Sequence, residues 1–383
     1  AEQMKTRTRT LTSLTILLSL GLVQSASGQN LLIRNGQMLD GNGGRVEGGT
    51  LVIRNGRISA YEEDASTSDF PVLEAEGLTV IPAFTDAHRQ IIQGDPDEWL
   101  EQAPQHMQRY LETGFTTLVT TDDSLEHILE LRDRLESREI EGPRLLVTGP
   151  VPLTNVTGGA ITEEQIRQAV RDLALAGLDG IASTVRTTPS GREQELMSIA
   201  RDEANEQGLL AITHIESVGD AIAALRGGSG YLTSTPHIGR LEPGTASNIV
   251  EAGRDNAEYG VVMTSTLDAI TSADPDSPAS ANARELWDAD IIYGFGTDSD
   301  FPPQEALRRE LAALGQSFSD QEIFSILTKN AALAARRDDA LGTLDRGKFA
   351  DIIILDGDPL TGIENVFNIR IVIKTGRIVV DNR

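Results

Sequence analysis

Residues 80–340 alternate apolar or β-branched runs with helical patterns, and this alternation constrains the fold more than any other feature of the sequence. Eight strand-like runs occur, at Thr79–Phe84, Thr116–Thr121, Arg144–Thr148, Gly180–Val185, Leu209–His214, Tyr231–Thr235, Gly260–Thr264 and Ile291–Gly296. Eight βα units in a stretch of about 260 residues match the number and size of a closed TIM (β/α)8 barrel, an α/β fold. A doubly wound open sheet is the alternative, because periodicity does not distinguish a closed sheet from an open one.

Helical patterns lie between the runs, and three of them follow a recognisable start signal. The clearest patterns cover Glu163–Ala176, Glu193–Glu206, Glu305–Leu314 and Asp320–Arg336. Thr162, Ser190 and Ser319 each stand three residues before a Gln or Glu, which is the spacing of a capping box. We therefore expect a helix to begin directly after each of these three residues.

Both ends of the chain have β character and flank the barrel pattern. The near copies Leu31–Gly36 and Leu51–Gly56 each end in Asn-Gly, a dipeptide typical of hairpin turns. Asp351–Leu355 and Ile371–Val380 are similarly rich in β-branched residues. The sequence therefore predicts one small composite β domain built from residues 29–80 and 341–383, with the barrel over residues 81–340.

The first residues have the order of a secretory signal. A basic stretch at 4–10 precedes the apolar run Leu11–Val23, and small residues follow up to Gly28. The apolar run is shorter than the ~20 residues that span a bilayer. We expect residues 1–28 to be a signal peptide, removed near Ser27 or Gly28, and the mature protein to be periplasmic or extracellular. An N-terminal anchor helix is the alternative.

The chain is strongly acidic and contains no cysteine. Asp and Glu number 58 against 33 Lys and Arg, for a formal net charge of -25. Such a surface repels phosphate groups, which makes nucleic acid and anionic lipid poor candidate partners. The missing cysteines exclude disulfides, thiolate nucleophiles and thiolate metal ligands. A small-molecule substrate is the expected partner, and the oligomeric state stays open.

Candidate chemistry gathers where the predicted strands end. The carboxyl ends of the strands in a TIM barrel meet at one mouth. Three of the five histidines, His88, His214 and His237, fall at such ends, and Asp298 follows the eighth run. The other two, His106 and His127, lie in helical stretches and are interpreted as surface residues. Asp122 and Asp123, after the second run, are interpreted as loop residues rather than ligands.

Several segments carry a resemblance to a known family. They are Thr79–His88, Gly114–Val119, Gly296–Ser299, and Gly342–Asp351 followed by Asp356–Leu360. In this order they resemble the amidohydrolase superfamily, and within it the imidazolonepropionase-like or prolidase-like branch. The resemblance runs from about residue 31 to 380, and its specificity comes from the ordered set rather than from any one motif.

The resemblance implies a metal site of which this sequence keeps a part. The family has His-x-His on strand 1, a Lys on strand 4, a His on each of strands 5 and 6, and an Asp on strand 8. His88, His214 and Asp298 match, whereas Gln90, Ala182 and Ser234 replace the second His, the Lys and the strand 6 His. The survivors imply at most one divalent metal, Zn²⁺ being the most suitable, held by His88, His214 and Asp298 with Gln90 as a weaker oxygen donor.

These residues imply a function with two alternatives. The leading hypothesis is an exported hydrolase of non-peptide carbon–nitrogen bonds, in which Asp298 and His214 are catalytic and at most one metal assists the attacking water. Candidate substrate-binding residues are His237, Ser234 and Arg186; a loop position for His237 and a surface ion pair for Arg186 are the alternatives. The rival functions are a binding protein that has lost its metal centre and its activity, and metal-free chemistry with Asp298 and His214 as acid and base.

Overall fold

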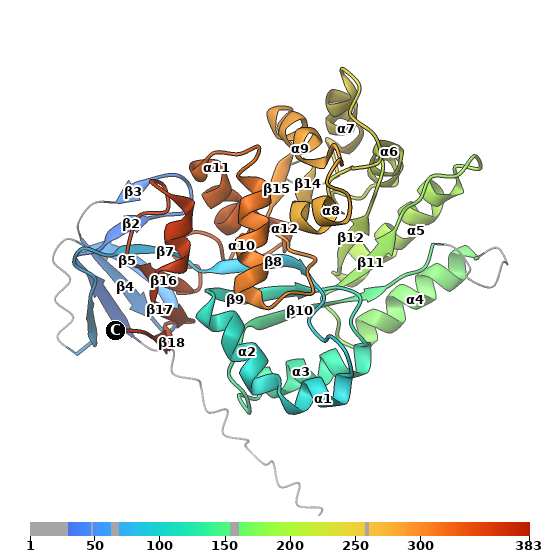
Figure 1. Cartoon of the computed structure of the whole chain (residues 1–383). Helices are drawn as coiled ribbons and strands as arrows, with labels where there is room; N and C mark the ends of the chain where they lie inside the picture. Colours follow the sequence, from blue (N-terminus) through green and yellow to red (C-terminus); the bar gives the residue numbers. More distant parts are fainter. Residues whose placement is uncertain (1–29, 47–48, 63–68, 154–160, 257–259) are drawn as a thin grey trace, which may run out of the picture.

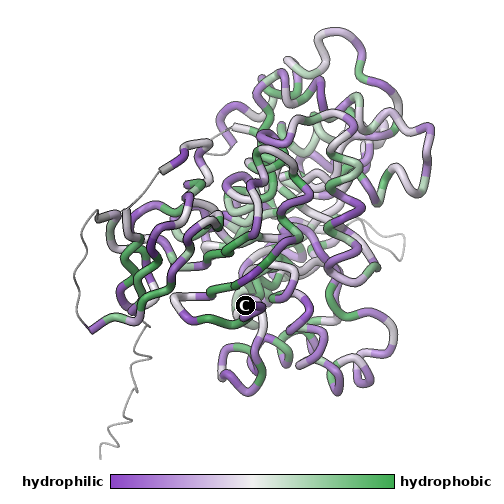
Figure 2. The backbone as a smooth tube through the Cα atoms, turned by 60° about the vertical axis from the view of Figure 1, so that its left-hand side comes forward, coloured by the Kyte–Doolittle hydropathy of each residue, from purple (hydrophilic) through white to green (hydrophobic). Residues whose placement is uncertain are grey.

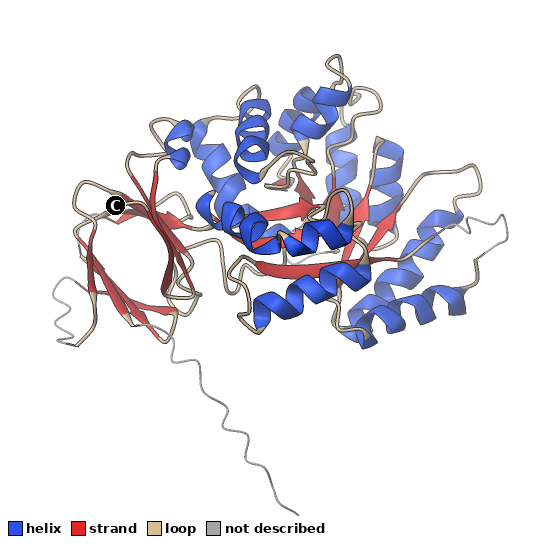
Figure 3. Ribbon diagram, turned by 60° about the horizontal axis from the view of Figure 1, so that its bottom comes forward, coloured by secondary structure: helices blue, strands red, loops and turns tan. Residues whose placement is uncertain are grey.

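The computed structural model describes residues 30–46, 49–62, 69–153, 161–256 and 260–383. In these ranges the chain forms a barrel surrounded by helices, with a β-sandwich beside it (Figures 1 and 3). The predicted signal peptide, residues 1–28, lies outside the described residues. No helix of the described ranges is both long enough and apolar enough to cross a membrane.

The predicted TIM barrel is confirmed. Its parallel strands follow one another in chain order around the sheet. They are β8 (Phe84–Arg89), β9 (Phe115–Thr120), β10 (Arg144–Pro150), β11 (Gly180–Thr184), β12 (Leu210–His214), β13 (Tyr231–Thr233), β14 (Val262–Thr264) and β15 (Ile292–Gly294). The chain just after β15 closes the ring: the Ala87 N–H donates to the Phe295 carbonyl at 2.9 Å, and the Asp298 N–H donates to the His88 carbonyl at 2.9 Å. The seam between β8 and β15 therefore lies beside two predicted site residues.

The helices surround the strands and carry most of the expected caps. They are α1 (Pro96–Glu101), α2 (Ala103–Glu112), α3 (Leu125–Glu136), α4 (Glu163–Leu175), α5 (Arg192–Gln207), α6 (Val218–Arg226), α7 (Thr245–Gly253), α8 (Leu267–Ala273), α9 (Ala279–Asp288), α10 (Pro303–Leu314), α11 (Asp320–Ser325) and α12 (Ala331–Ala334). Thr162 and Ser319 form the predicted capping boxes. The prediction for Ser190 is wrong, because α5 begins after Gly191 at φ 65° and the Glu193 carboxylate accepts from Thr188 instead.

The pattern at Asp320–Arg336 is also not one continuous α-helix. A π-helical turn, Ile326–Asn330, separates α11 from α12. The carbonyl of Ile326 accepts the N–H of Phe295 at 3.0 Å, so it is used by the barrel. A Cβ on Gly294 would lie 2.7 Å from the Asn330 carbonyl oxygen, so β15 touches this turn directly. The π turn thus accommodates a close approach between helix and strand.

The composite β domain is confirmed as a sandwich that draws on both ends of the chain. One sheet has the order β5-β4-β1-β6, and the other has the order β18-β17-β16-β7-β2-β3. The first contains β1 (Leu31–Arg34), β4 (Thr50–Arg54), β5 (Arg57–Glu62) and β6 (Val72–Glu74); the second contains β2 (Gln37–Leu39), β3 (Arg45–Val46), β7 (Thr79–Pro82), β16 (Ile352–Leu355), β17 (Ile369–Lys374) and β18 (Arg377–Asp381). One apolar cluster, which includes Ile33, Ile53, Val80, Ile352 and Ile373, joins strands of both sheets. Figure 2 shows hydrophobic stretches of the chain in both units.

Two local predictions at this domain are corrected. The run Thr79–Phe84 is not one barrel strand: β7 pairs antiparallel with β16 in the sandwich, and the barrel begins at Phe84. The chain changes sheets at Ala83, whose N–H donates to the Asp351 carbonyl. Asn55-Gly56 forms the predicted hairpin between β4 and β5, but Asn35-Gly36 turns the chain from one sheet into the other.

Candidate active site

A cavity of about 290 Å³ lies at the carboxyl ends of the barrel strands. Three of the predicted site residues, His88, His214 and Asp298, line it, and Ala182 of β11 lines it as well. The remaining lining residues are Thr121, Asp122, Pro150, Val151, Pro152, Leu153, Ser183, Thr184, Ile212 and Thr233. The fold therefore brings together side chains from strands that are far apart in sequence.

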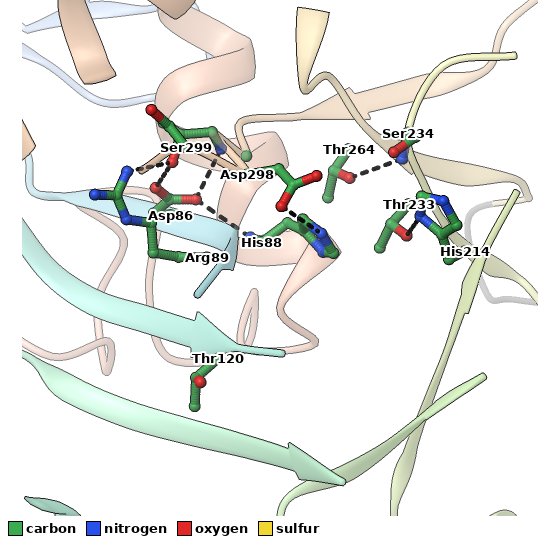
Figure 4. A network of polar contacts seen from close by, with 12 residues as sticks. Asp86, His88, Arg89, Thr120, His214, Thr233, Ser234, Thr264, Asp298 and Ser299 are labelled. Atoms are coloured by element: carbon green, nitrogen blue, oxygen red, sulfur yellow. Dashed lines mark hydrogen bonds and ion pairs between the residues drawn. The ribbon is translucent and has the colours of Figure 1, made fainter. Parts of the chain in front are cut away.

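His88 and Asp298 form the closest pair of ionisable groups in the cavity (Figure 4). His88 is buried near the end of β8, and its Nε2 lies 3.5 Å from Oδ1 of the more exposed Asp298. The Asp298 N–H also donates to the His88 carbonyl at 2.9 Å, so backbone and side chains of the two residues meet. His88 Nδ1 is buried and has no hydrogen-bond partner among the described residues. The pair is thus fixed by the barrel seam.

The environment separates the protonation states of the two histidines. Burial lowers the pKa of His88, but the hydrogen bond to Asp298 and the charge of Asp298 outweigh it, so the pKa of His88 is raised. Burial raises the pKa of Asp298, yet its contact with His88 holds that pKa below the usual value. Burial, with the charge of His88 next, lowers the pKa of His214. The cavity therefore favours an imidazolium–carboxylate pair and a neutral His214.

Asp86 supports this pair from inside the barrel wall, and the sequence analysis did not single it out. Its buried carboxylate accepts the Thr297 hydroxyl at 2.6 Å, the Thr297 N–H at 3.1 Å and the His88 N–H at 3.2 Å. Burial raises the pKa of Asp86, although these donors and Arg89 oppose that effect. The i, i+2 spacing from His88 along a strand is the signal that points to it.

His214 faces the cavity from β12 and has two neighbours of its own. Its Nδ1 lies 3.3 Å from the Thr233 hydroxyl, and its Nε2 lies 3.9 Å from Oε1 of Glu216. Glu216 in turn accepts a hydrogen bond of 2.9 Å from Arg186. Arg186 is therefore an exposed residue in a surface ion pair, the alternative that the sequence left open, and is not among the residues that line the cavity.

Three further candidates lie outside the described lining of the cavity, namely Gln90, Ser234 and His237. Gln90 directly follows β8 and is half-buried. The Ser234 N–H donates to the Thr264 hydroxyl at 3.3 Å, and the neighbouring Thr233 takes the place in the lining. His237 Nδ1 lies 3.1 Å from the Thr235 carbonyl. Successive side chains of a strand point to opposite faces. A prediction that is wrong by one position therefore selects Ser234 in place of Thr233, which lines the cavity.

Non-glycine residues in left-handed backbone conformations gather at the same end of the barrel. Asp122 (φ 63°), Ser234 (φ 69°), Thr266 (φ 46°) and Asp298 (φ 43°) follow β9, β13, β14 and β15 respectively. This conformation is unfavourable for residues with a Cβ, most of all for β-branched Thr266. Strain of this kind persists where the surrounding structure imposes it, and it concentrates at functional sites.

The three candidate ligands, His88, His214 and Asp298, fit a metal ion by their chemistry but not by their placement. His88, His214 and Asp298 have the right chemistry for Zn²⁺ and line one cavity. In the described ranges, however, no three His, Asp or Glu side chains come close enough together to hold one ion. His88 and Asp298 meet at one point, whereas His214 is turned toward Glu216. As placed, these residues do not form a three-ligand cage.

Comparisons with known proteins agree with the fold. The model of the amidohydrolase family matches residues 79–379. Imidazolonepropionase of Thermoplasma volcanium is 25% identical over 367 residues, which cover 86% of this chain and 89% of that enzyme. A crystal structure of an amidohydrolase has a TM-score of 0.78 at 20% identity and covers 92% of this chain and 99% of its own. A Xaa-Pro dipeptidase with bound methionine in the active site has a TM-score of 0.75 at 20% identity, over 91% and 99% of the two chains.

Proposed function

Because this chain belongs to the amidohydrolase family and resembles its imidazolonepropionase-like or prolidase-like branch, we propose that it hydrolyses carbon–nitrogen bonds other than ordinary peptide bonds in a small molecule. The observation that carries the proposal is the His88–Asp298 pair at the barrel seam between β8 and β15, where His88 Nε2 and Asp298 Oδ1 are 3.5 Å apart. An ionised carboxylate beside an imidazolium, at the mouth of a barrel, is suited to moving the protons of a hydrolysis.

In the proposed reaction, Asp298 takes a proton from the attacking water while the water oxygen bonds to the substrate carbonyl carbon. The imidazolium of His88 keeps Asp298 ionised and therefore available as a base at neutral pH. When the carbon–nitrogen bond breaks, the same proton passes from Asp298 to the leaving nitrogen. Atoms and charge balance without a further reactant.

His214 is assigned a second role in this reaction. Its lowered pKa keeps the ring neutral, and in this proposal the Thr233 hydroxyl donates to Nδ1, so that the ring proton lies on Nε2, 3.9 Å from Oε1 of Glu216. That N–H can donate to the carbonyl oxygen as negative charge develops on it. Asp298 and His214 then act from opposite sides of the scissile bond.

The proposal includes an upper limit of one divalent metal. Ala182 on β11 supplies no ligand, and the three remaining donors do not converge, so no step above passes through a metal. Elemental analysis of protein purified without chelator measures the ratio directly, and we expect about one metal per chain or less, from the ligand count. Two tightly held ions per chain would overturn this part.

Activity is tested on a panel of amides, lactams and imides. We expect Asp298→Asn to lower kcat at least about 100-fold, since a positioned general base contributes 10²–10⁴ in rate. His214→Ala should lower it as well, and Asp290→Asn, at the other end of the barrel, is the control. If no compound of the panel turns over, the rival binding protein without activity replaces the proposal.

Export remains part of the proposal. It rests on the order of basic, apolar and small residues in segment 1–28. N-terminal sequencing of the protein from its own host tests it. An intact Met4 in a cytosolic fraction would refute export.

A further inference from the structure

The loop between β9 and α3 places a carboxylate in the cavity for which the proposed reaction has no use. Asp122 lines the cavity together with His88, His214 and Asp298. Its negative charge is one of the influences that favour the protonated form of both histidines, although the pKa of His214 is lowered overall by burial. Among the described residues, no Lys or Arg nitrogen lies within the 4.0 Å of an ion pair from Asp122. A carboxylate in this state is available to a ligand.

The position of Asp122 is imposed by its neighbour. The carboxylate of Asp123 is buried and accepts the N–H groups of Ile91, at 3.0 Å, and of Ile92, at 2.8 Å. It also accepts the hydroxyl of Thr120, the last residue of β9. These bonds fix the loop to the segment after β8, and Asp122 is held at φ 63° in front of them. The backbone at Asp122 is therefore in place before any ligand arrives.

No Lys or Arg lines the cavity in the described part of the chain, and the ring of His88 is paired with Asp298. The two arginines nearest the strand ends are engaged elsewhere. Arg186 is paired with Glu216, and buried Arg89 donates to the hydroxyls of Tyr110 and Thr297 and to the Phe301 carbonyl. Segment 154–160, which continues from the lining residue Leu153, contains no Lys or Arg in its sequence. A negatively charged ligand therefore meets no unpaired Lys or Arg here, and His88 is already paired with Asp298.

Another part of the cavity lining is apolar. It consists of Pro150–Leu153, at the end of β10, together with Ile212 of β12. Pro150 and Pro152 have no N–H, so this segment offers few donors to a polar ligand. An aliphatic or aromatic body can cover it.

From these observations we infer that the substrate is a cation: an amide whose apolar body packs on Pro150–Leu153 and whose protonated amine is bound by Asp122. The inference rests on the proposed function for the identity of the scissile bond, and on the cavity alone for the charge preference. Asp122 is a specificity-determining residue in this account, because it discriminates between substrates by charge without taking part in bond breaking.

Three amides with the same number of carbon atoms test the charge preference: 6-aminohexanamide, hexanamide and 6-amino-6-oxohexanoate, which are cationic, neutral and anionic. Calorimetry measures their binding, and ammonia release measures their turnover. For the wild type we expect affinity and kcat/KM to fall about tenfold from the cation to the neutral amide, and further to the anion, as for a charge-assisted contact open to solvent. Asp122→Asn should bring the cation and the neutral amide within about twofold of each other.

Asp290→Asn is the matched control. Asp290 is exposed, stands at φ 69° before β15 at the other end of the barrel, and carries the same charge. It should leave the preference unchanged, and equal losses in both variants would show an effect of net charge and overturn the inference. Turnover without the expected ranking would also overturn it. Cation-selective binding without any turnover would refute the proposed function and leave the charge preference standing.

Discussion

Asp123→Ala should destabilise the protein by about 3 kcal/mol, although the residue lies in a loop. The substitution removes the acceptor of the Ile91 and Ile92 N–H groups, which belong to residues only 2% and 6% exposed. A buried donor without a partner costs about 1–3 kcal/mol, so two cost about 2–6 kcal/mol. Part of this loss of stability is recovered, because the variant no longer buries a carboxylate. That burial is unfavourable, as the raised pKa of Asp123 shows. After this recovery, a value in the lower half of the range, about 3 kcal/mol, is the expected loss.

Equilibrium unfolding in urea measures this loss, and two substitutions calibrate it. Asp123→Asn keeps one carbonyl oxygen and should cost about 1–2 kcal/mol. Asp122→Asn, at the adjacent exposed position, should cost less than about 0.5 kcal/mol, since asparagine tolerates a left-handed backbone. If the free energies of unfolding of Asp123→Ala and Asp122→Asn differed by less than about 0.5 kcal/mol, the stabilising role assigned to the Asp123 hydrogen bonds would be refuted.

Two further stability predictions follow from the barrel. Burial raises the pKa of Glu310 to about 7, so between pH 4.5 and 7 the folded protein keeps a proton that the unfolded chain releases. Stability should therefore fall by about 3 kcal/mol as pH rises through this window. The free energy of unfolding of the wild type and of Glu310→Gln, measured at pH 5 and pH 8, isolates the contribution of Glu310. An equal pH dependence in both proteins would contradict the prediction. Gly296→Ala places a Cβ 3.0 Å from His88 Cβ and 3.1 Å from Thr264 Cβ. It should cost about 1–3 kcal/mol in thermal unfolding and lower turnover, and a fully active, equally stable variant would show that the seam has room.

The barrel was predictable because each of its strands is an apolar run of sufficient length between helical patterns. Hydrogen-bond partners were less predictable. The run Thr79–Phe84 reads as one strand, yet it divides at Ala83 because Asp351, nearly 270 residues later, accepts the Ala83 N–H. Only the return of β16 to this edge determines where the chain changes sheets. Nothing local at residues 79–84 encodes that contact.

The candidate site likewise contains residues that the sequence could predict and residues that it could not. His88, His214 and Asp298 were found because they lie at or shortly after the ends of strands, and position along a strand is a local property. Asp122 and Asp123 are identical in type and adjacent, and no local pattern shows which one faces the cavity. The difference arises from the Ile91 and Ile92 N–H groups, which reach only Asp123. Sequence reasoning therefore identified the end of the barrel that carries the chemistry but not the side chains that complete it.

Barrel closure and the proposed catalytic pair depend on the same contacts. The Asp298 N–H closes the ring on the His88 carbonyl, and this bond brings the two side chains within reach of each other. Asp86 joins the two sides from beneath, since its carboxylate accepts from His88 on one side of the seam and from Thr297 on the other. Gln90 and Ala182 take part in none of these bonds. The proposed pair therefore depends on closure of the barrel at the seam and not on the identity of the residues at positions 90 and 182.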